Sequence, residues 1–390
     1  MKKFNKNILL FAAAAVFVLI GLCSKPLLGG LCDSVKNLCQ QVVSGEPDAF
    51  ADFVVEVDAA SQKLSTKPLL LDLNSLKDNL LGTRIVVKRE TTVVKADSGS
   101  LLGYLITEPI SEEAIQQNAS DIEQIKELAH AAGADFLYCA VTPKTFYETL
   151  PANMTEFNTK RYEDTLEALS FHNIPVLDTR AFFQEMGMEK DELFFRTDHH
   201  WTPLAGFHVA GAICRELQML YGFSFDPALA NLENYHIETY SDWFLGSYGK
   251  QTGSFFTASR VDDFDLITPR FQTSFTEEIP IKNVNRTGPF EDTMIHTGNL
   301  EKDYYNINTY TAYSGGDYRL QIITNHNQPA GAKILIVRNS YGCVVTPFLA
   351  LHAQQLHVID NRDGSYPSGE KVNLEEYIRS VEPDYVIVLE

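Results

Sequence analysis

Clustered basic residues are missing from this chain. It has 32 Lys and Arg against 51 Asp and Glu, which gives a formal net charge of −19 and a pI near 4.9. A surface that binds nucleic acid needs gathered Lys and Arg to neutralise the phosphates. The composition therefore excludes nucleic acid as a partner, and the acidic balance suits an exported protein.

Cysteine is also sparse, with 6 residues in a chain of 390. This number is too low for a disulfide scaffold, and no cysteine spacing matches a zinc site. Cys32 and Cys39 are close enough in sequence to pair outside the cytoplasm. By contrast, Cys139, Cys214 and Cys343 lie in apolar runs, so they are expected to be small buried hydrophobic residues.

The N-terminal apolar run is too short for a comfortable transmembrane span. Lys2, Lys3 and Lys6 precede apolar residues 8–23, which resemble the charged and hydrophobic regions of an export signal. A membrane helix usually needs roughly 20 apolar residues. Residues 1–30 are therefore a signal peptide or a retained signal anchor, and the lack of a clear Ala-x-Ala site favours the anchor. The chain is expected outside the cytoplasm, membrane-anchored or secreted.

Hydrophobic periodicity divides the rest of the chain. Residues 31–80 have weak helical periodicity and are interpreted as a stalk or N-terminal helical segment, whereas residues 81–390 are interpreted as one catalytic domain. Within this domain, residues 222–330 are rich in aromatics, Gly, Thr and Asn, and predict an insert of short strands and loops that faces the substrate.

Outside the insert, apolar strands alternate with helical patterns. The predicted strands are 135–141, 174–178, 333–338, 355–360 and 385–389, and the predicted helices are 114–132, 161–172, 203–217 and 374–381. This alternation predicts an α/β fold with a mostly parallel sheet covered on both faces. Functional groups are then expected at the carboxyl ends of the strands.

A carboxylate and an imidazole stand close together where Asp198 precedes His200 by two residues, and a hydroxyl follows a predicted strand at Ser340. These are the parts of a nucleophilic serine enzyme. In this hypothesis His200 takes the proton of Ser340, and Asp198 orients the imidazole and stabilises its cation. Thr202 and Pro203 predict a helix that begins directly after this segment, and its dipole favours a neutral base.

Ser340 also has a purely structural interpretation. Asn339 or Ser340 could simply cap the following helix. The nucleophile elbow requires glycine two residues before the serine, and Arg338 stands there instead. The elbow motif therefore does not by itself support a catalytic serine.

A metal site is a second alternative, because Asp198, His199 and His200 form a legitimate ligand set. Neighbouring residues on an extended chain point to opposite faces, so His199 and His200 are not expected to converge on one ion. We therefore expect no metal, and we expect His199 to form hydrogen bonds that support the catalytic residues.

Trp201 is either a sugar-stacking residue or part of the core.

Several ordered motifs together resemble the bacterial DHHW protein family. They are residues 194–202 with the Asp-His-His-Trp core, residues 313–318, residues 333–342 with 345–350, and residues 358–360. The likeness covers roughly residues 80–390. This family is similar to the SGNH-type alginate O-acetyltransferases, in which an Asp-x-His motif precedes the nucleophilic serine. Family members usually carry Asp at the position of Asn339, so this chain lacks a charge beside the hydroxyl.

The resemblance implies an SGNH-hydrolase-like three-layer fold and assigns roles to individual residues. It makes Ser340 the nucleophile, His200 the base and Asp198 its partner. Donors to the oxyanion are expected from the N–H of Ser340 and from the regions around Gly246 and Gly316, although these glycines could equally form ordinary turns. The remaining candidates are Asn339 and His199 beside the reacting groups, and Trp201 and Tyr341 for substrate contact.

The resulting expectation is an extracytoplasmic O-acyltransferase, most simply an O-acetyltransferase, that acts on a cell-envelope or secreted polysaccharide. The resemblance implies a polytopic membrane O-acyltransferase as acyl donor, attachment to the membrane through the N-terminal segment, and no organic cofactor. A carbohydrate esterase with the same triad is the nearest alternative, because water could intercept the acyl-enzyme. A catalytically silent polysaccharide-binding or assembly protein is the other.

Overall fold

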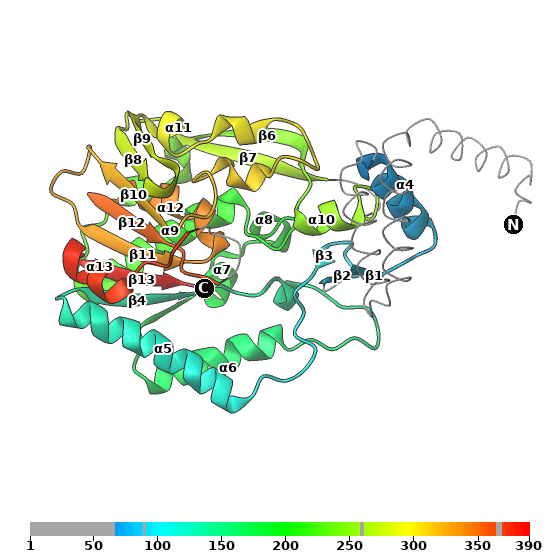
Figure 1. Cartoon of the computed structure of the whole chain (residues 1–390), viewed down its shortest axis with the longest axis horizontal. Coiled ribbons are helices and arrows are strands. Elements are labelled where there is room, and N and C mark those ends of the chain that lie inside the picture. The colour runs from blue at the N-terminus through cyan, green and yellow to red at the C-terminus, as the bar shows by residue number, and fades with distance from the viewer. Residues whose placement is uncertain (1–66, 89–90, 258–260, 364–368) are drawn as a thin grey trace, which may run out of the picture. The chain divides into compact units, whose positions relative to one another are not determined.

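The computed structural model describes residues 67–88, 91–257, 261–363 and 369–390 (Figure 1). The expected export segment and the Cys32–Cys39 pair lie outside the described residues. The chain divides into two compact units, residues 1–77 and 78–390, and helix α4 (Lys67–Leu80) contains the boundary. Within the described ranges, no helix combines the length and apolar character needed to cross a membrane.

An eight-stranded sheet forms the centre of the second unit (Figure 1). Its order is β5 (Val176–Asp178), β4 (Asp135–Ala140), β13 (Tyr385–Leu389), β11 (Lys333–Arg338), β12 (Gln355–Ile359), β10 (Leu320–Asn325), β8 (Phe275–Ile279) and β9 (Val284–Gly288). Neighbours from β5 to β12 pair in parallel, and the pairs from β12 to β9 are antiparallel. The predicted α/β fold is confirmed.

Helices cover both faces of this sheet, and the side chains of β4 show why. Leu137 and Cys139 belong to one hydrophobic core, whereas Phe136 and Tyr138 belong to the other. Alternate residues of a strand point to opposite faces, so a strand with apolar side chains on both faces needs cover on both sides. The helices around the sheet are α5 (Glu112–Ala131), α6 (Asn158–Phe171), α7 (Thr179–Met186), α8 (Lys190–Leu193), α9 (Pro203–Tyr221), α12 (Thr346–Leu349) and α13 (Leu374–Val381).

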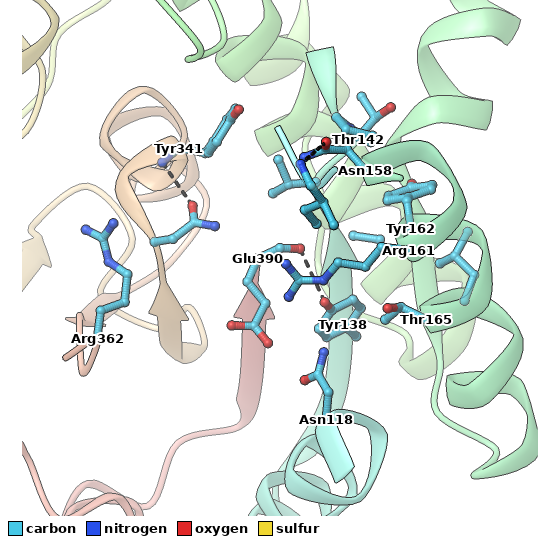
Figure 2. Close-up of a pocket in the computed structure, with 16 residues that line it drawn as sticks. Asn118, Tyr138, Thr142, Asn158, Arg161, Tyr162, Thr165, Tyr341, Arg362 and Glu390 are labelled. Carbon is cyan, nitrogen blue, oxygen red and sulfur yellow. Dashed lines mark hydrogen bonds between the residues drawn. The ribbon is translucent and has the colours of Figure 1, made fainter. Parts of the chain in front are cut away.

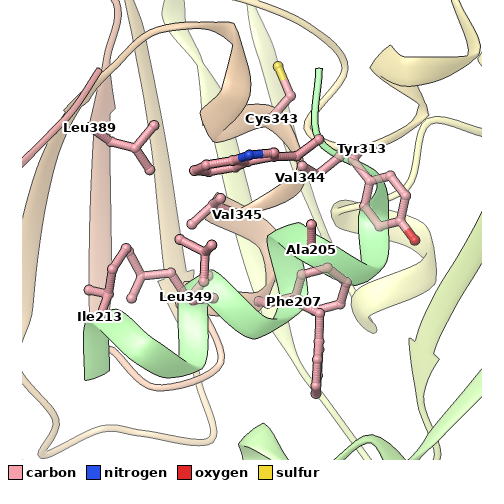
Figure 3. Close-up of a cluster of buried hydrophobic side chains, with 14 of the residues drawn as sticks. Ala205, Phe207, Ile213, Tyr313, Cys343, Val344, Val345, Leu349 and Leu389 are labelled. Atoms are coloured by element: carbon pink, nitrogen blue, oxygen red, sulfur yellow. The ribbon is translucent and has the colours of Figure 1, made fainter. Parts of the chain in front are cut away.

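The core on the α9 face positions the segment that follows β11. Ala205 and Phe207 of α9 pack in one cluster with Val344, Val345 and Leu349 (Figure 3). Gly206 allows this close approach, because a Cβ there would lie 2.4 Å from the carbonyl oxygen of Val344. The beginning of α9 and the segment after β11 are therefore held together.

Cys139, Cys214 and Cys343 are free and buried, as predicted.

Region 222–330 contributes to more than one part of the fold. Strands β6 (Tyr235–Phe244) and β7 (Asp262–Pro269) form a separate antiparallel ribbon, with a register irregularity between Tyr240 and Phe244. Strands β8, β9 and β10 instead extend the central sheet. The short helices α10 (Ser247–Thr252) and α11 (Phe290–Thr293) lie in the same region, and β1 (Ile85–Lys88), β2 (Thr91–Lys95) and β3 (Leu101–Leu102) form a small third sheet.

Candidate active site

Ser340 lies just beyond the carboxyl end of β11, at the first residue of a 3-10 turn that runs to Val344. Asn339 caps this turn, because its side-chain oxygen accepts the N–H of Tyr341 at 3.0 Å. The capping role considered from the sequence thus belongs to Asn339. The hydroxyl of the half-buried Ser340 is left to contact other groups.

Asp198 and His200 lie in the irregular segment between α8 and α9. The side chain of Thr202 caps α9 by accepting the N–H of Ala205, and Pro203 begins the helix, as the sequence predicted. Asp198 is 3% exposed, and its Oδ1 accepts the N–H groups of His199 at 2.7 Å and His200 at 3.0 Å. These bonds form a tight local turn that brings the imidazole of His200 back to its own carboxylate.

The structure brings the side chains of Asp198, His200 and Ser340 together. His200 Nδ1 lies 2.6 Å from Asp198 Oδ1, and His200 Nε2 lies 2.8 Å from Ser340 Oγ. The carboxylate accepts from Nδ1–H, which leaves the Nε2 lone pair directed at the serine hydroxyl. This is the arrangement that allows an imidazole to remove a proton from an alcohol.

The carboxylate of Asp198 is held in its ionised form. Burial alone would raise the pKa of Asp198, but the adjacent histidines and the backbone N–H of Ser247 outweigh burial and keep it well below its usual value. That N–H lies 2.5 Å from Asp198 Oδ2. The carboxylate can therefore stabilise a cationic His200 without taking its proton.

His199 does not point away from His200, and that sequence expectation is wrong. The ring centroids are 3.8 Å apart with an interplanar angle of 35°, and His199 Nδ1 lies 3.2 Å from Asp198 Oδ1. The alternation argument fails because this segment turns instead of extending. Burial, with the charge of His200, lowers the pKa of His199 to about 3, so its ring is neutral at neutral pH.

This convergence reopens the question of a metal ion. Asp198, His199 and His200 offer ligand atoms that all lie within 4.8 Å of one another. However, Asp198 Oδ1 already accepts hydrogen bonds from the backbone and from His200, and His200 Nε2 already faces Ser340. An ion would have to replace these bonds, so the hydrogen bonding favours the serine arrangement.

Two tyrosines enclose the imidazole. Tyr310 stacks on His200 with ring centroids 4.1 Å apart, and its hydroxyl donates to the carbonyl of Ser340 at 3.0 Å. Tyr341 donates its hydroxyl to the carbonyl of His199 at 2.8 Å. Sequence reasoning missed Tyr310, because it lies in an irregular part of the insert with no local pattern. Tyr341 was expected to contact substrate, but its hydroxyl is used inside the protein.

The substrate-stacking alternative for Trp201 is wrong. Its side chain is fully buried, with its ring edge-on to Phe183 and 5.1 Å from Tyr341. A buried indole cannot stack on a sugar ring, and Trp201 instead packs under the active-site segment. Core packing, the other interpretation of this residue, describes what the structure shows.

The glycines expected near an oxyanion have different surroundings. The N–H of Gly246 donates to Thr197 Oγ1 at 2.8 Å, so it is not available to an oxyanion and that prediction is wrong. Gly246 instead makes room for Asp198, because a Cβ at this position would lie 2.3 Å from Asp198 Cβ. Gly316 has φ of +128° and accepts from Arg338 Nη2 at 2.9 Å. Its role as a donor stays a prediction.

A pocket of about 460 Å³ borders the two residues that flank Ser340 (Figure 2). Asn339 and Tyr341, which flank Ser340 in the chain, form part of its wall together with Arg362. The other wall comes from the end of β4, from α6 and from the end of the chain, and includes Tyr138, Asn158, Arg161, Tyr162 and Glu390. A substrate group bound in this pocket would lie against Asn339 and Tyr341, the neighbours of Ser340 in the chain.

Two protein-family models match parts of this chain. Residues 173–359 match the family described as DHHW protein, and residues 99–235 match the SGNH hydrolase-like domain of acetyltransferase AlgX. The expected resemblance to the DHHW family is confirmed. Asp198, His199 and His200 lie where the two matched ranges overlap.

Solved structures share the fold. A DHHW family protein from Eubacterium siraeum is 19% identical, with 78% of this chain and 91% of that chain covered and a TM-score of 0.56. Two structures of Bacillus cereus PatB1 are also similar. One carries a sulfonyl adduct (15% identity, 77% and 94% covered, TM-score 0.63), and for the second structure the values are 16% identity, 77% and 95% covered, and a TM-score of 0.61. At these identities the likeness shows a common fold. No curated protein sequence matches the chain.

Proposed function

We propose that this protein is an extracytoplasmic O-acyltransferase, most simply an O-acetyltransferase, which modifies a cell-envelope or secreted polysaccharide through Ser340. The observation that carries the proposal is the 2.8 Å contact between Ser340 Oγ and His200 Nε2, with Asp198 on the other ring nitrogen. The match to the domain of an acetyltransferase supports acyl transfer as the reaction class.

The geometry supports a two-step transfer. His200 Nε2 takes the hydroxyl proton as Ser340 Oγ bonds to the acyl carbon of the donor, and the resulting imidazolium returns that proton to the departing oxygen. This leaves an acyl-serine. A sugar hydroxyl then gives its proton to His200 and bonds to the acyl carbon, and Ser340 leaves with the proton. Asp198 keeps the imidazole oriented and stabilises its charge in both steps.

The proposed acyl donor and acceptor follow from the proposed location outside the cytoplasm. Acetyl-CoA is not found outside the cytoplasm, so the proposed donor is an acyl group delivered by a polytopic membrane O-acyltransferase. The proposed acceptor is a polysaccharide, and residues 1–30 would keep the protein at the membrane. No step requires an organic cofactor.

Covalent labelling tests the nucleophile. The similar PatB1 structure with a sulfonyl adduct suggests a sulfonyl fluoride as the probe. We expect intact-protein and peptide mass spectrometry to place one sulfonyl group on Ser340, and no group on Ser340→Ala. Ser380→Ala is the matched control, because Ser380 is an exposed serine on α13 and should not change labelling. Labelling at another residue, or none in wild type, would contradict the proposal.

Transfer and hydrolysis must then be separated. Purified protein is incubated with a chromogenic acetyl ester, with and without an envelope oligosaccharide, and acetylated sugar is measured by mass spectrometry. Acetylated sugar that requires Ser340 supports a transferase. Release of acetate alone identifies an esterase. Sugar binding without labelling or turnover identifies a catalytically silent binding protein.

A further inference from the structure

Arg362 presents a guanidinium to the candidate nucleophile. It follows the end of β12, and its Nη1 lies 3.5 Å from Ser340 Oγ. The sequence offers no local motif for this residue, because Arg362 and Ser340 are brought together only by the pairing of β11 with β12. Arg362 is also the arginine that borders the pocket on the side of Asn339 and Tyr341.

The orientation of this guanidinium is set by two carboxylates. Its Nη2 lies 2.6 Å from Asp360 Oδ2 and 3.1 Å from Asp317 Oδ2, and its Nε lies 3.0 Å from Asp360 Oδ1. Since a guanidinium is a rigid planar fork, fixing Nε and Nη2 also fixes the direction of Nη1. The nitrogen that faces Ser340 is therefore the one that neither carboxylate holds.

The two carboxylates that hold Arg362 are fixed in turn, Asp360 by burial and Asp317 by Arg338. Asp360 is fully buried, and Asp317 Oδ1 accepts from Arg338 Nη1. The side chain of Arg338 is 0% exposed, whereas that of Arg362 is 41% exposed. Burial alone would raise the pKa of Asp317, but the guanidinium of Arg338, then that of Arg362, outweighs it and lowers that pKa.

This arrangement differs from an ordinary surface ion pair. An isolated, exposed ion pair contributes little stability. Here one fully buried carboxylate, Asp360, and one partly buried carboxylate, Asp317, hold an exposed arginine with a nitrogen directed at a reactive hydroxyl. Arg338, which replaces the glycine of the nucleophile elbow, supplies the base of this network. The two carboxylates, with Arg338 behind Asp317, therefore fix where the guanidinium of Arg362 lies.

We propose that Arg362 stabilises the oxyanion of the tetrahedral intermediate, an assignment that rests on the acyl-transfer function proposed above. When Ser340 Oγ bonds to the acyl carbon, the carbonyl electron pair moves onto oxygen and His200 takes the serine proton. The oxyanion shares its carbon with Oγ, so a donor 3.5 Å from Oγ can reach it at hydrogen-bond distance. Arg362 Nη1–H donates to this oxygen and keeps its proton throughout.

Hydrolysis of p-nitrophenyl acetate by the full chain tests the assignment, because this neutral ester has no anionic group for an arginine to bind. We expect Arg362→Ala to lower kcat by roughly 10²-fold or more with KM changed by only about twofold. Arg362→Lys should retain part of the activity, because a cationic donor remains. Arg379→Ala, at an exposed arginine on α13, is the matched control and should equal wild type.

Chemical rescue separates oxyanion stabilisation from a structural role. Because Arg362 is partly exposed, its removal leaves space that a small cation can enter. Added guanidinium ion at low millimolar concentration should raise kcat of Arg362→Ala several-fold and leave wild type unchanged. Thermal unfolding of both variants is measured in parallel, and the rescue should occur without a change in melting temperature.

Three outcomes would overturn the assignment, and they can be distinguished. If Arg362→Ala hydrolyses the neutral ester like wild type but loses acetylation of an oligosaccharide, Arg362 binds the acceptor instead. If wild type neither hydrolyses the ester nor reacts with a sulfonyl fluoride, the acyl-transfer function fails and the assignment fails with it. Loss of activity without guanidinium rescue, together with a lowered melting temperature, makes Arg362 a structural residue.

Discussion

The ammonium of Lys144 lies 2.8 Å from the backbone carbonyl oxygen of Asp198. Lys144 is 6% exposed and also donates to the carbonyls of Leu101 at 2.9 Å, Phe195 at 2.7 Å and Arg196 at 3.2 Å. One buried cation thus gathers the carbonyls of the segment that carries Asp198 and His200. The turn that presents the imidazole to Ser340 depends on a residue far from it in sequence.

Replacing this cation should disturb both stability and the site. Lys144→Met keeps the aliphatic stem but leaves the buried carbonyls without their donor, which should cost about 3 kcal/mol of unfolding free energy. Urea unfolding measures this loss, and sulfonyl labelling of Ser340 should slow in the same variant. Lys160→Met, at an exposed lysine on α6, is the control and should unfold like wild type. Equal unfolding of Lys144→Met and wild type would contradict the role given to Lys144.

Asp198→Asn should abolish most catalysis while leaving the chain folded. The amide cannot accept from Nδ1–H and from the surrounding backbone in the way the carboxylate does, so His200 would adopt the wrong tautomer. We expect kcat for ester hydrolysis to fall roughly 10⁴-fold. Asp164→Asn, at a surface ion pair on α6, should have no effect. An Asp198→Asn variant with a nearly normal kcat would show that Asp198 does not orient the base.

His199 should make the protein sensitive to acid. Burial lowers its pKa in the folded state to about 3, whereas an unfolded histidine titrates near 6.5. Between these values the unfolded chain binds the extra proton, so stability is lost as the pH falls from about 6.5 towards 3. His199→Gln removes this term, and wild type should therefore lose about 3 kcal/mol more than the variant between pH 7 and pH 4. Parallel losses in urea unfolding at the two pH values would refute this account.

Gly246→Ala should be poorly tolerated because of space and not because of backbone conformation. The backbone of Gly246 has an ordinary φ of −69°, but an added methyl would lie 2.3 Å from Asp198 Cβ and 2.7 Å from the carbonyl oxygen of Thr197. Relief requires movement of the segment that holds Asp198. We expect a loss of about 2 kcal/mol and a clear drop in ester hydrolysis.

Gly298→Ala is the control for this variant, since no atom lies within 4 Å of a Cβ at that position. Thermal unfolding and the rate of ester hydrolysis are measured for both variants. The close-approach argument fails if the two alanine variants behave alike.

Features that depend on local periodicity could be predicted from the amino-acid order alone. Short runs rich in Ile and Val, such as 333–338 and 385–389, predict strands buried on both faces, and Thr202-Pro203 begins a helix through its own hydrogen bonding and ring geometry. The DHHW resemblance was visible from the same short motifs. These properties arise within a few residues, so no knowledge of the packing is needed.

Contacts between residues that are far apart in the chain arise from strand order and packing. The order of β11 and β12 in the sheet brings Arg362 to Ser340, and packing brings Lys144 and Tyr310 to the segment of His200. Packing also buries Trp201 and brings the ring of His199 against that of His200. An extended chain would instead point these two rings to opposite faces. Contacts of this kind depend on strand order and on the space between packed elements, which a pattern of neighbouring residues does not contain.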